Sequence, residues 1–350
     1  MLNSLSSKAT VAKARAIYGK RLKREDYHEL LHRCSVEEIA EYLKRNTHYK
    51  NVLESINPAT AHRGLLENLL QRDNFELYVK LCKFQHLQSI PFYNYLVVQQ
   101  EVGEIVSSIL HLNAGASEDY IATLPSYLIN HASFNLLELA KARDYEDILK
   151  VLRHTPYYNI IKDAIPDEHG FYDCTKIEAD LRTNYLKWLS KEIEKNFSGQ
   201  TSKDLSYLIK TQLDLINVIN GFRLKALSKA GADDIEPYML HFYGRLSRNQ
   251  QRELFEAADA EDYIKRFQKT YYGRQMEDFP EPLTTERLEQ YAHALRHRYA
   301  ALTLRQSQSA PVSVYTIVYL FQIEVQNIIT IIEGIRYKAP LSYIEKLLIV

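Results

Sequence analysis

The residues best suited to chemistry lie at positions 28–32, where His28-Glu29-Leu30-Leu31-His32 is a complete His-Glu-x-x-His motif. On a helix, this spacing places two imidazoles on one face, where they can bind zinc while the glutamate acts as a general base. The third ligand of a metzincin, at the spacing His-x-x-Gly-x-x-His, does not follow. A zinc hydrolase that uses His28 and His32 is therefore a remote alternative, and we expect a solvated helix face.

A second polar set is Asp214-x-x-Asn217 followed by Arg223 and Lys225. These residue types suit two roles: hydrogen bonds and an ion pair within the helix that fix how it docks, or contact with a partner. The glycine motifs that cradle phosphate and the Gly-x-Ser-x-Gly motif of a nucleophilic serine are absent from the sequence. We therefore expect no catalytic residue, no cofactor and no metal.

The helices that carry these residues belong to a unit that the sequence repeats three times. Residues 35–53, 145–162 and 260–276 share an acidic start, an apolar pair four residues apart and a Thr-x-Tyr ending. The endings are Thr47/Tyr49, Thr155/Tyr157 and Thr270/Tyr272. We expect a structural corner at each ending, in which the threonine bonds to the backbone and the tyrosine buries its ring while its hydroxyl stays in water.

Two further markers follow the same period. The Asp214-x-x-Asn217 pattern returns as Glu324-x-x-Asn327, whereas the first copy is degenerate, with Glu101 and Glu104 in the corresponding helix. A Gly-Ala pair also recurs at residues 115–116 and 231–232. We expect three similar helical-bundle domains, at residues 1–113, 114–230 and 231–350.

Composition supports an all-α protein. Glycine (11) and proline (10) are scarce among 350 residues, so few tight turns are available for a sandwich or a barrel. Lysine and arginine together number 44, as do aspartate and glutamate, so the charge gives no sign of nucleic-acid binding. The three cysteines are far apart, which fits a reducing compartment. Charged residues interrupt the most apolar stretch, residues 312–335, so we expect no membrane span.

Taken together, the chain resembles the central-stalk subunit of V-type and A-type rotary ATPases, which is the C subunit in bacteria and archaea and the d subunit in eukaryotes. The resemblance covers essentially the whole chain. It rests on Ala14-Arg15-Ala16 with Leu22 downstream, the three Thr-x-Tyr elements, Asp214-x-x-Asn217…Arg223-x-Lys225 and Glu324-x-x-Asn327…Gly334-x-Arg336-x-Lys338. Two departures occur: the first unit lacks the acidic-x-x-Asn signature, and the last unit places its arginine three residues later than the second.

The resemblance implies three helical domains with approximate threefold symmetry, arranged as a funnel. One face would receive the rotor shaft of the soluble sector, and the other would sit on the membrane proteolipid ring. The chain would be a non-catalytic, peripheral subunit at the cytoplasmic face of a membrane, without a small-molecule substrate. It would couple the shaft to the ring for ATP-driven H⁺ or Na⁺ transport, or for ATP synthesis.

Two hypotheses remain beside this one. A helical scaffold for soluble partners would typically repeat every 33–47 residues, whereas the period here is about 115 residues. The N-terminal segment is basic, and Lys20, Arg21, Lys23 and Arg24 are candidates for contact with acidic headgroups or with an acidic patch on a partner.

Overall fold

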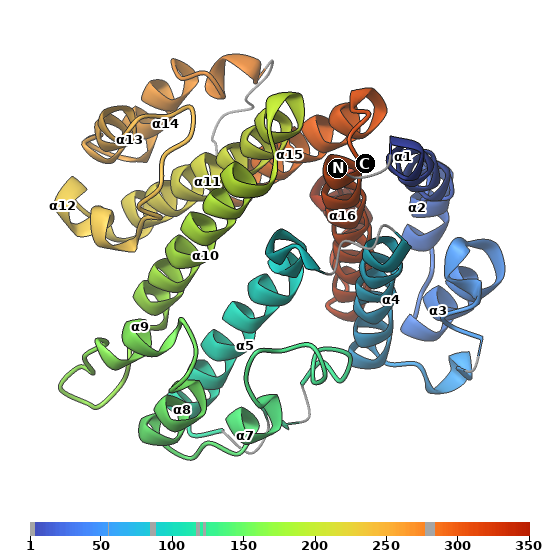
Figure 1. The fold of residues 1–350 in the computed structure, drawn as a ribbon, viewed down its shortest axis with the longest axis horizontal. Coiled ribbons are helices and arrows are strands. Elements are labelled where there is room, and N and C mark those ends of the chain that lie inside the picture. The colour runs from blue at the N-terminus through green and yellow to red at the C-terminus, as the bar shows by residue number, and fades with distance from the viewer. Residues whose placement is uncertain (1–3, 55, 85–88, 117–119, 122–123, 277–283) are drawn as a thin grey trace. The chain divides into compact units, whose positions relative to one another are not determined.

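The computed structural model describes residues 4–54, 56–84, 89–116, 120–121, 124–276 and 284–350. Within these ranges every regular element is a helix, so the predicted all-α class is confirmed (Figure 1). The chain forms two compact units. Unit 1 comprises residues 1–89, 198–208 and 286–350, and unit 2 comprises residues 90–197 and 209–285. The predicted boundaries of three domains, at 1–113, 114–230 and 231–350, stay a prediction, as does their funnel arrangement.

Unit 1 is built around a long helix near the C-terminus. Its elements are α1 (Ser4–Tyr18), α2 (Arg24–Leu31), α3 (Val36–Asn46), η1 (His48–Lys50), η2 (Pro58–Thr60), α4 (Arg63–Phe84), the start of α11 (Gly199–Ser228), α15 (Thr285–Gln306), α16 (Ala310–Arg336) and α17 (Leu341–Leu347). The central helix α16 packs against α1, α3, α4 and α17. Its isoleucines form a continuous core with leucines of α2, α3 and α4.

The length and apolar character of α16 come from this central position. Its most apolar window has a mean hydropathy of 1.3, enough by length and composition for a membrane span, but 78% of that window is buried within the protein. A helix this apolar and this largely buried is typical of a protein core. The Asn74 side chain of α4 donates a hydrogen bond to the Val318 carbonyl oxygen at 3.3 Å and fixes the contact between the two helices.

Unit 2 contains two further sets of helices. Its elements are η4 (Pro91–Asn94), α5 (Tyr95–Asn113), α7 (Leu136–Ala140), α8 (Tyr145–Leu152), α9 (Tyr158–Lys162), α10 (Cys174–Asn196), the remainder of α11, α12 (Ala232–Ile235), η5 (Glu236–Tyr238), α13 (Arg248–Phe255), α14 (Ala260–Gln268) and η6 (Gly273–Gln275). Helices α5 and α10 pack together. Helix α14 is joined to α11 by Tyr263, whose hydroxyl donates to the Val218 carbonyl oxygen at 2.9 Å.

The three repeated segments start with the same helix cap. Ser35, Asp144 and Asp259 stand in extended backbone just before α3, α8 and α14, and each side chain accepts a hydrogen bond from the backbone amide three residues on. Such a cap satisfies one of the amides that a helix start leaves without a partner. The repeated acidic residues follow these caps in the first helical turn, where negative charge is favourable beside the amides of the helix start.

Candidate functional site

The Thr-x-Tyr endings lead to three buried clusters, each built around one carboxylate of a long helix. Tyr157 donates its hydroxyl to Glu101 of α5 at 2.5 Å, and Tyr272 donates to Asp214 of α11 at 2.9 Å. Tyr49 donates to Glu324 of α16, also at 2.9 Å. We call these the Glu101, Asp214 and Glu324 clusters.

The sequence-based expectation that these hydroxyls stay in water is wrong. Tyr49, Tyr157 and Tyr272 are at most 2% exposed, and each hydroxyl bonds to a carboxylate. The reason is that a buried phenol needs a hydrogen-bond partner, and an acidic side chain on the facing helix supplies it. The threonines do bond to the backbone, as expected: their hydroxyls donate to the carbonyl oxygens of Leu43, Leu152 and Phe267.

Each carboxylate also accepts hydrogen bonds from backbone amides just before a short helix. Glu324 accepts from the Leu22 amide at 2.6 Å, before α2, and Glu101 accepts from the Ser133 amide, before α7. Asp214 accepts from three successive amides before α13, those of residues 244, 245 and 246, at 3.1, 2.7 and 3.1 Å. A buried carboxylate is expensive unless it is hydrogen-bonded, and these donors meet that requirement.

In each cluster the tyrosine bonds to an acid that lies outside its own repeated segment. Tyr157 and Tyr272 each bond to an acid that lies 56 or 58 residues earlier in the chain, on the preceding long helix. Tyr49 has no preceding long helix and bonds instead to Glu324, 275 residues later. The first and last repeats therefore complete one cluster between them, inside unit 1. Sequence reasoning placed Glu101 and Glu324 in equivalent helices but did not predict this pairing.

The residues three positions after these acids also hold distant segments. The Asn217 side chain donates to the Leu240 carbonyl oxygen at 3.0 Å and accepts from the Leu240 amide at 2.8 Å. Asn327 makes the same pair of bonds with Ile349, at 2.7 and 3.0 Å. In the first copy Glu104 accepts the Tyr120 hydroxyl at 2.8 Å. The bonds of Asp214 and Asn217 join separate segments of one chain instead of residues within the helix, and contact of this set with a partner stays a prediction.

The electrostatics of the clusters keep the phenols protonated. Burial raises the pKa of Tyr157, and the neighbouring Glu101 carboxylate raises it further. The pKa of Tyr49 is raised well above its usual value by the same two causes, with Glu324 as the neighbour. Burial also raises the pKa of Asp214, although the hydrogen bonds it accepts act in the opposite direction. The clusters are thus suited to holding helices together.

The His28–His32 motif lies at the exposed side of α2. The two rings are 4.4 Å apart, but His32 Nδ1 lies 2.8 Å from the His28 carbonyl oxygen, and Glu29 forms an ion pair with Arg33 at 2.9 Å. Across the ranges that the structure describes, no group of three or more His, Cys, Asp or Glu side chains is placed to hold a metal ion.

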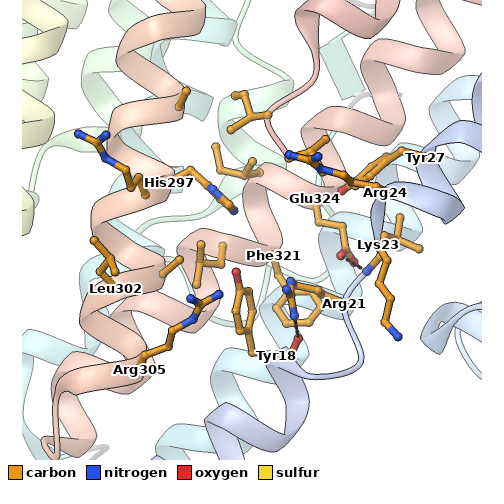
Figure 2. A pocket seen from close by; sticks show the side chains of 18 of the residues that line it. Tyr18, Arg21, Lys23, Arg24, Tyr27, His297, Leu302, Arg305, Phe321 and Glu324 are labelled. Carbon is orange, nitrogen blue, oxygen red and sulfur yellow. Dashed lines mark hydrogen bonds between the residues drawn. The ribbon is translucent and has the colours of Figure 1, made fainter. Parts of the chain in front are cut away.

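A pocket of about 650 Å³ opens beside the Glu324 cluster in unit 1 (Figure 2). We call it the arginine pocket. Its cationic lining comes from the segment before α2, from the first residue of α2 and from α15, and residues of α16 also line it. The lining residues used below are Tyr18, Arg21, Lys23, Arg24, Glu25, Tyr27, His297, Arg298, Arg305, Phe321, Glu324 and Val350. Three of the four basic residues singled out in the N-terminal segment therefore line this pocket.

The two walls of the pocket are held by specific contacts. Arg21 lies over the ring of Tyr18 at 4.3 Å and donates to the Tyr18 carbonyl oxygen at 3.2 Å. Arg15 of α1 donates to the carbonyl oxygens of Leu304 and Arg305 at 3.0 and 2.8 Å, which ties α1 to the end of α15. Burial lowers the pKa of His297, and the Arg21 and Arg305 guanidinium groups lower it further.

Sequence reasoning missed the α15 half of this pocket. Arg298 and Arg305 lie on the same face of the helix, because a spacing of seven residues is close to two full turns, and His297 is adjacent to Arg298. An arginine pair seven residues apart was the available signal. It became meaningful only once the fold placed that face opposite Arg21 and Arg24, residues more than 270 positions earlier in the chain.

Comparisons with a family model and with individual proteins point to the same subunit family. The family model for the ATP synthase (C/AC39) subunit matches residues 10–347. The C subunit of the A-type ATP synthase of Methanosphaera stadtmanae is 23% identical over 345 residues, covering 97% of this chain and 86% of that protein. The protein of the same name from Methanosarcina mazei is 26% identical over 273 residues, covering 75% of this chain and 69% of that protein.

Proposed function

Since the chain belongs to the ATP synthase (C/AC39) subunit family, we propose that it joins the rotor shaft of an A-type ATP synthase to the proteolipid ring in the membrane. It is a stalk subunit of a rotary ATPase and has no catalytic role of its own. In this proposal it turns with both partners and passes torque between the soluble sector and the ring.

The observation that carries the proposal is the family match over residues 10–347. The buried clusters support it on physical grounds. A torque adaptor must resist deformation, and close-packed helices deform little under load. In each cluster one carboxylate fixes a long helix, a Thr-x-Tyr corner and the start of a short helix at a single point. Such junctions stiffen a bundle more than apolar packing alone, because hydrogen bonds are directional.

Within this proposal the chain is peripheral to the membrane, on its cytoplasmic face. The burial of α16 supports a peripheral position, because the helix most apolar in composition serves as the core of unit 1. The transported ion is H⁺ or Na⁺, and its identity is a property of the ring. The complex runs in the direction of transport or of ATP synthesis according to the balance of ATP and ion gradient.

Purification of the tagged full-length chain from detergent-solubilised native membranes tests the proposal. We expect the proteolipid and the shaft subunits to co-purify, and cross-linking mass spectrometry to place both in contact with this chain. A tagged, unrelated helical protein from the same cells serves as the control. Recovery of the chain without shaft or proteolipid subunits, under conditions that keep the rest of the complex intact, would contradict it.

A further inference from the structure

We propose that the arginine pocket of unit 1 binds a multivalent phosphate group, carried either by a soluble polyphosphate or by a lipid headgroup. This inference stands on the pocket alone and does not depend on the proposed function. The basic N-terminal segment was expected to contact acidic headgroups or an acidic patch on a partner. The proposal assigns it one class of ligand, a phosphate group.

Positive charge converges on the pocket from two sides. Figure 2 shows Arg21 and Arg24 on the N-terminal segment, facing His297 and Arg305 on α15. Lys23 and Arg298 also line the pocket. One wall is a local run of basic residues, and the fold places the cations of α15, which are far away in sequence, opposite it.

Few negative groups balance these cations. The carboxylates in the lining are those of Glu25 and Glu324, and a terminal carboxylate on Val350 would still leave the cations in excess. Glu324 is already engaged, because it accepts hydrogen bonds from the Leu22 amide and the Tyr49 hydroxyl and lies 2.6 Å from His48 Nε2. Arg21, Arg24 and Arg305 form no ion pair with a carboxylate in the part of the chain that the structure describes.

The chemistry of the lining favours phosphate. A guanidinium group presents a planar fork of donors that matches the oxygens of phosphate, and several such groups around one space suit an anion with more than one charge. A volume of about 650 Å³ is in the usual range for a small-molecule site. Tyr18, Tyr27 and Phe321 add apolar area, against which a base or an acyl segment attached to the phosphate can pack.

His297 lies in the positive electrostatic field of the arginines that line the pocket. The guanidinium groups of Arg21 and Arg305 both disfavour its protonated form, so both act at one position. A bound anion offsets them, and the imidazole then takes up a proton more readily. We therefore expect ligand binding to raise the pKa of His297. The other charged groups that face this space are Lys23, Arg24, Glu25, Arg298 and Glu324.

Isothermal titration of the full-length chain with inorganic tripolyphosphate tests the proposal, at about 0.15 M salt. The variant Arg24→Gln/Arg305→Gln removes one cation from each wall, and we expect it to weaken binding at least about tenfold. The control is Arg143→Gln/Arg153→Gln, which removes two exposed arginines from unit 2 and leaves the pocket intact. We expect binding by the control to stay within about twofold of the wild type. Thermal unfolding of each variant shows whether the fold is preserved.

A second arm separates the two sources of phosphate. Phosphatidylcholine vesicles that contain about one-tenth phosphatidic acid are sedimented with the wild type and with both variants. Binding of tripolyphosphate without vesicle recruitment supports a soluble ligand, and arginine-dependent recruitment supports a lipid headgroup. The proposal is overturned if tripolyphosphate and vesicle binding are both absent or unaffected in Arg24→Gln/Arg305→Gln. It is also overturned if an oligoglutamate peptide is the only probe that binds in an arginine-dependent way.

Discussion

The Asp214 cluster of unit 2 and the Glu324 cluster of unit 1 are built from the same parts but differ in their surroundings. Each has a buried acid on a long helix, a tyrosine that donates to it and a backbone segment that precedes a short helix. Three backbone amides donate hydrogen bonds to the Asp214 carboxylate. Glu324 receives one amide, lies 2.6 Å from His48 Nε2 and also lines the arginine pocket.

The comparison shows which parts of the cluster occur in both units and which parts differ between them. The junction of carboxylate, tyrosine and amide is preserved in both units, because removing the carboxylate would leave a buried tyrosine hydroxyl and a buried amide without their partner. The amides that Asp214 binds have no full counterpart around Glu324, and polar side chains and a pocket occupy that side. The copy with fewer backbone donors is therefore the one next to a cavity that can take a ligand.

The largest expected difference comes from the two acids themselves. Replacement of Asp214 by asparagine leaves one or more of three buried amides without an acceptor, and we expect unit 2 to lose about 3 kcal/mol of unfolding free energy. Glu324→Gln should cost about half as much, because fewer donors depend on it. Hydrogen exchange at residues 244–246 and at residue 22 measures the two effects separately. Asp163→Asn, at an exposed site, is the control. Equal losses of unfolding free energy in the two variants would show that the two acids do not differ in the number of donors that depend on them.

The backbone at Gly244 tests how closely the Asp214 cluster is packed. A Cβ atom at this position would lie 2.5 Å from Asp214 Oδ2 and 2.7 Å from the Lys210 carbonyl oxygen. We expect Gly244→Ala to destabilise unit 2 by about 2 kcal/mol, as overpacking of a filled site does. Gly103→Ala is the matched control, since a Cβ there meets nothing within 4 Å. In a helix this substitution should be neutral or stabilising by up to about 1 kcal/mol. Similar chemical denaturation midpoints for the two variants would show that the site is not close-packed.

The asparagines sharpen the comparison further. Asn217 holds Leu240 and also donates to Gln251 at 2.9 Å, whereas Asn327 holds Ile349 and has a side-chain hydrogen bond with Tyr27, which lines the arginine pocket. We expect Asn217→Ala and Asn327→Ala each to cost about 2 kcal/mol. Deletion of residues 349–350 should cost less than Asn327→Ala, because the contact with Tyr27 remains, and the two losses should be less than additive, because both changes remove the bonds to Ile349. Additive losses in thermal unfolding would contradict the assignment.

The smallest effect is expected from pH. His297 has a lowered pKa in the folded chain, so the unfolded chain binds more protons as the pH falls through about 6.5. Unit 1 should therefore lose stability on acidification from pH 7.5, and His297→Gln should flatten that dependence. For Asp214 the sign is reversed: its raised pKa favours the protonated folded form, so its contribution to unit 2 improves as the pH falls. A pH dependence of unit 1 that is unchanged in His297→Gln would exclude this role for the histidine.

The sequence predicted the helical class and the repeated corner, because these depend on residues close together in the chain. The caps Ser35, Asp144 and Asp259 are equally local, although their recurrence in all three repeats was not predicted. The partners of the buried tyrosines could not be predicted, because the pairing of Tyr49 with Glu324 depends on how the first and last repeats meet. For the same reason the basic N-terminal segment was recognised, but its opposite wall on α15 was not.

The most direct test of the central claim, that this chain couples shaft rotation to the membrane ring, is ATP-driven ion uptake by membrane vesicles that lack it. We predict that ATP hydrolysis by the soluble sector continues while ion uptake is lost, and that adding the purified chain restores uptake. Ion uptake that persists at the wild-type rate in the absence of the chain would contradict the account.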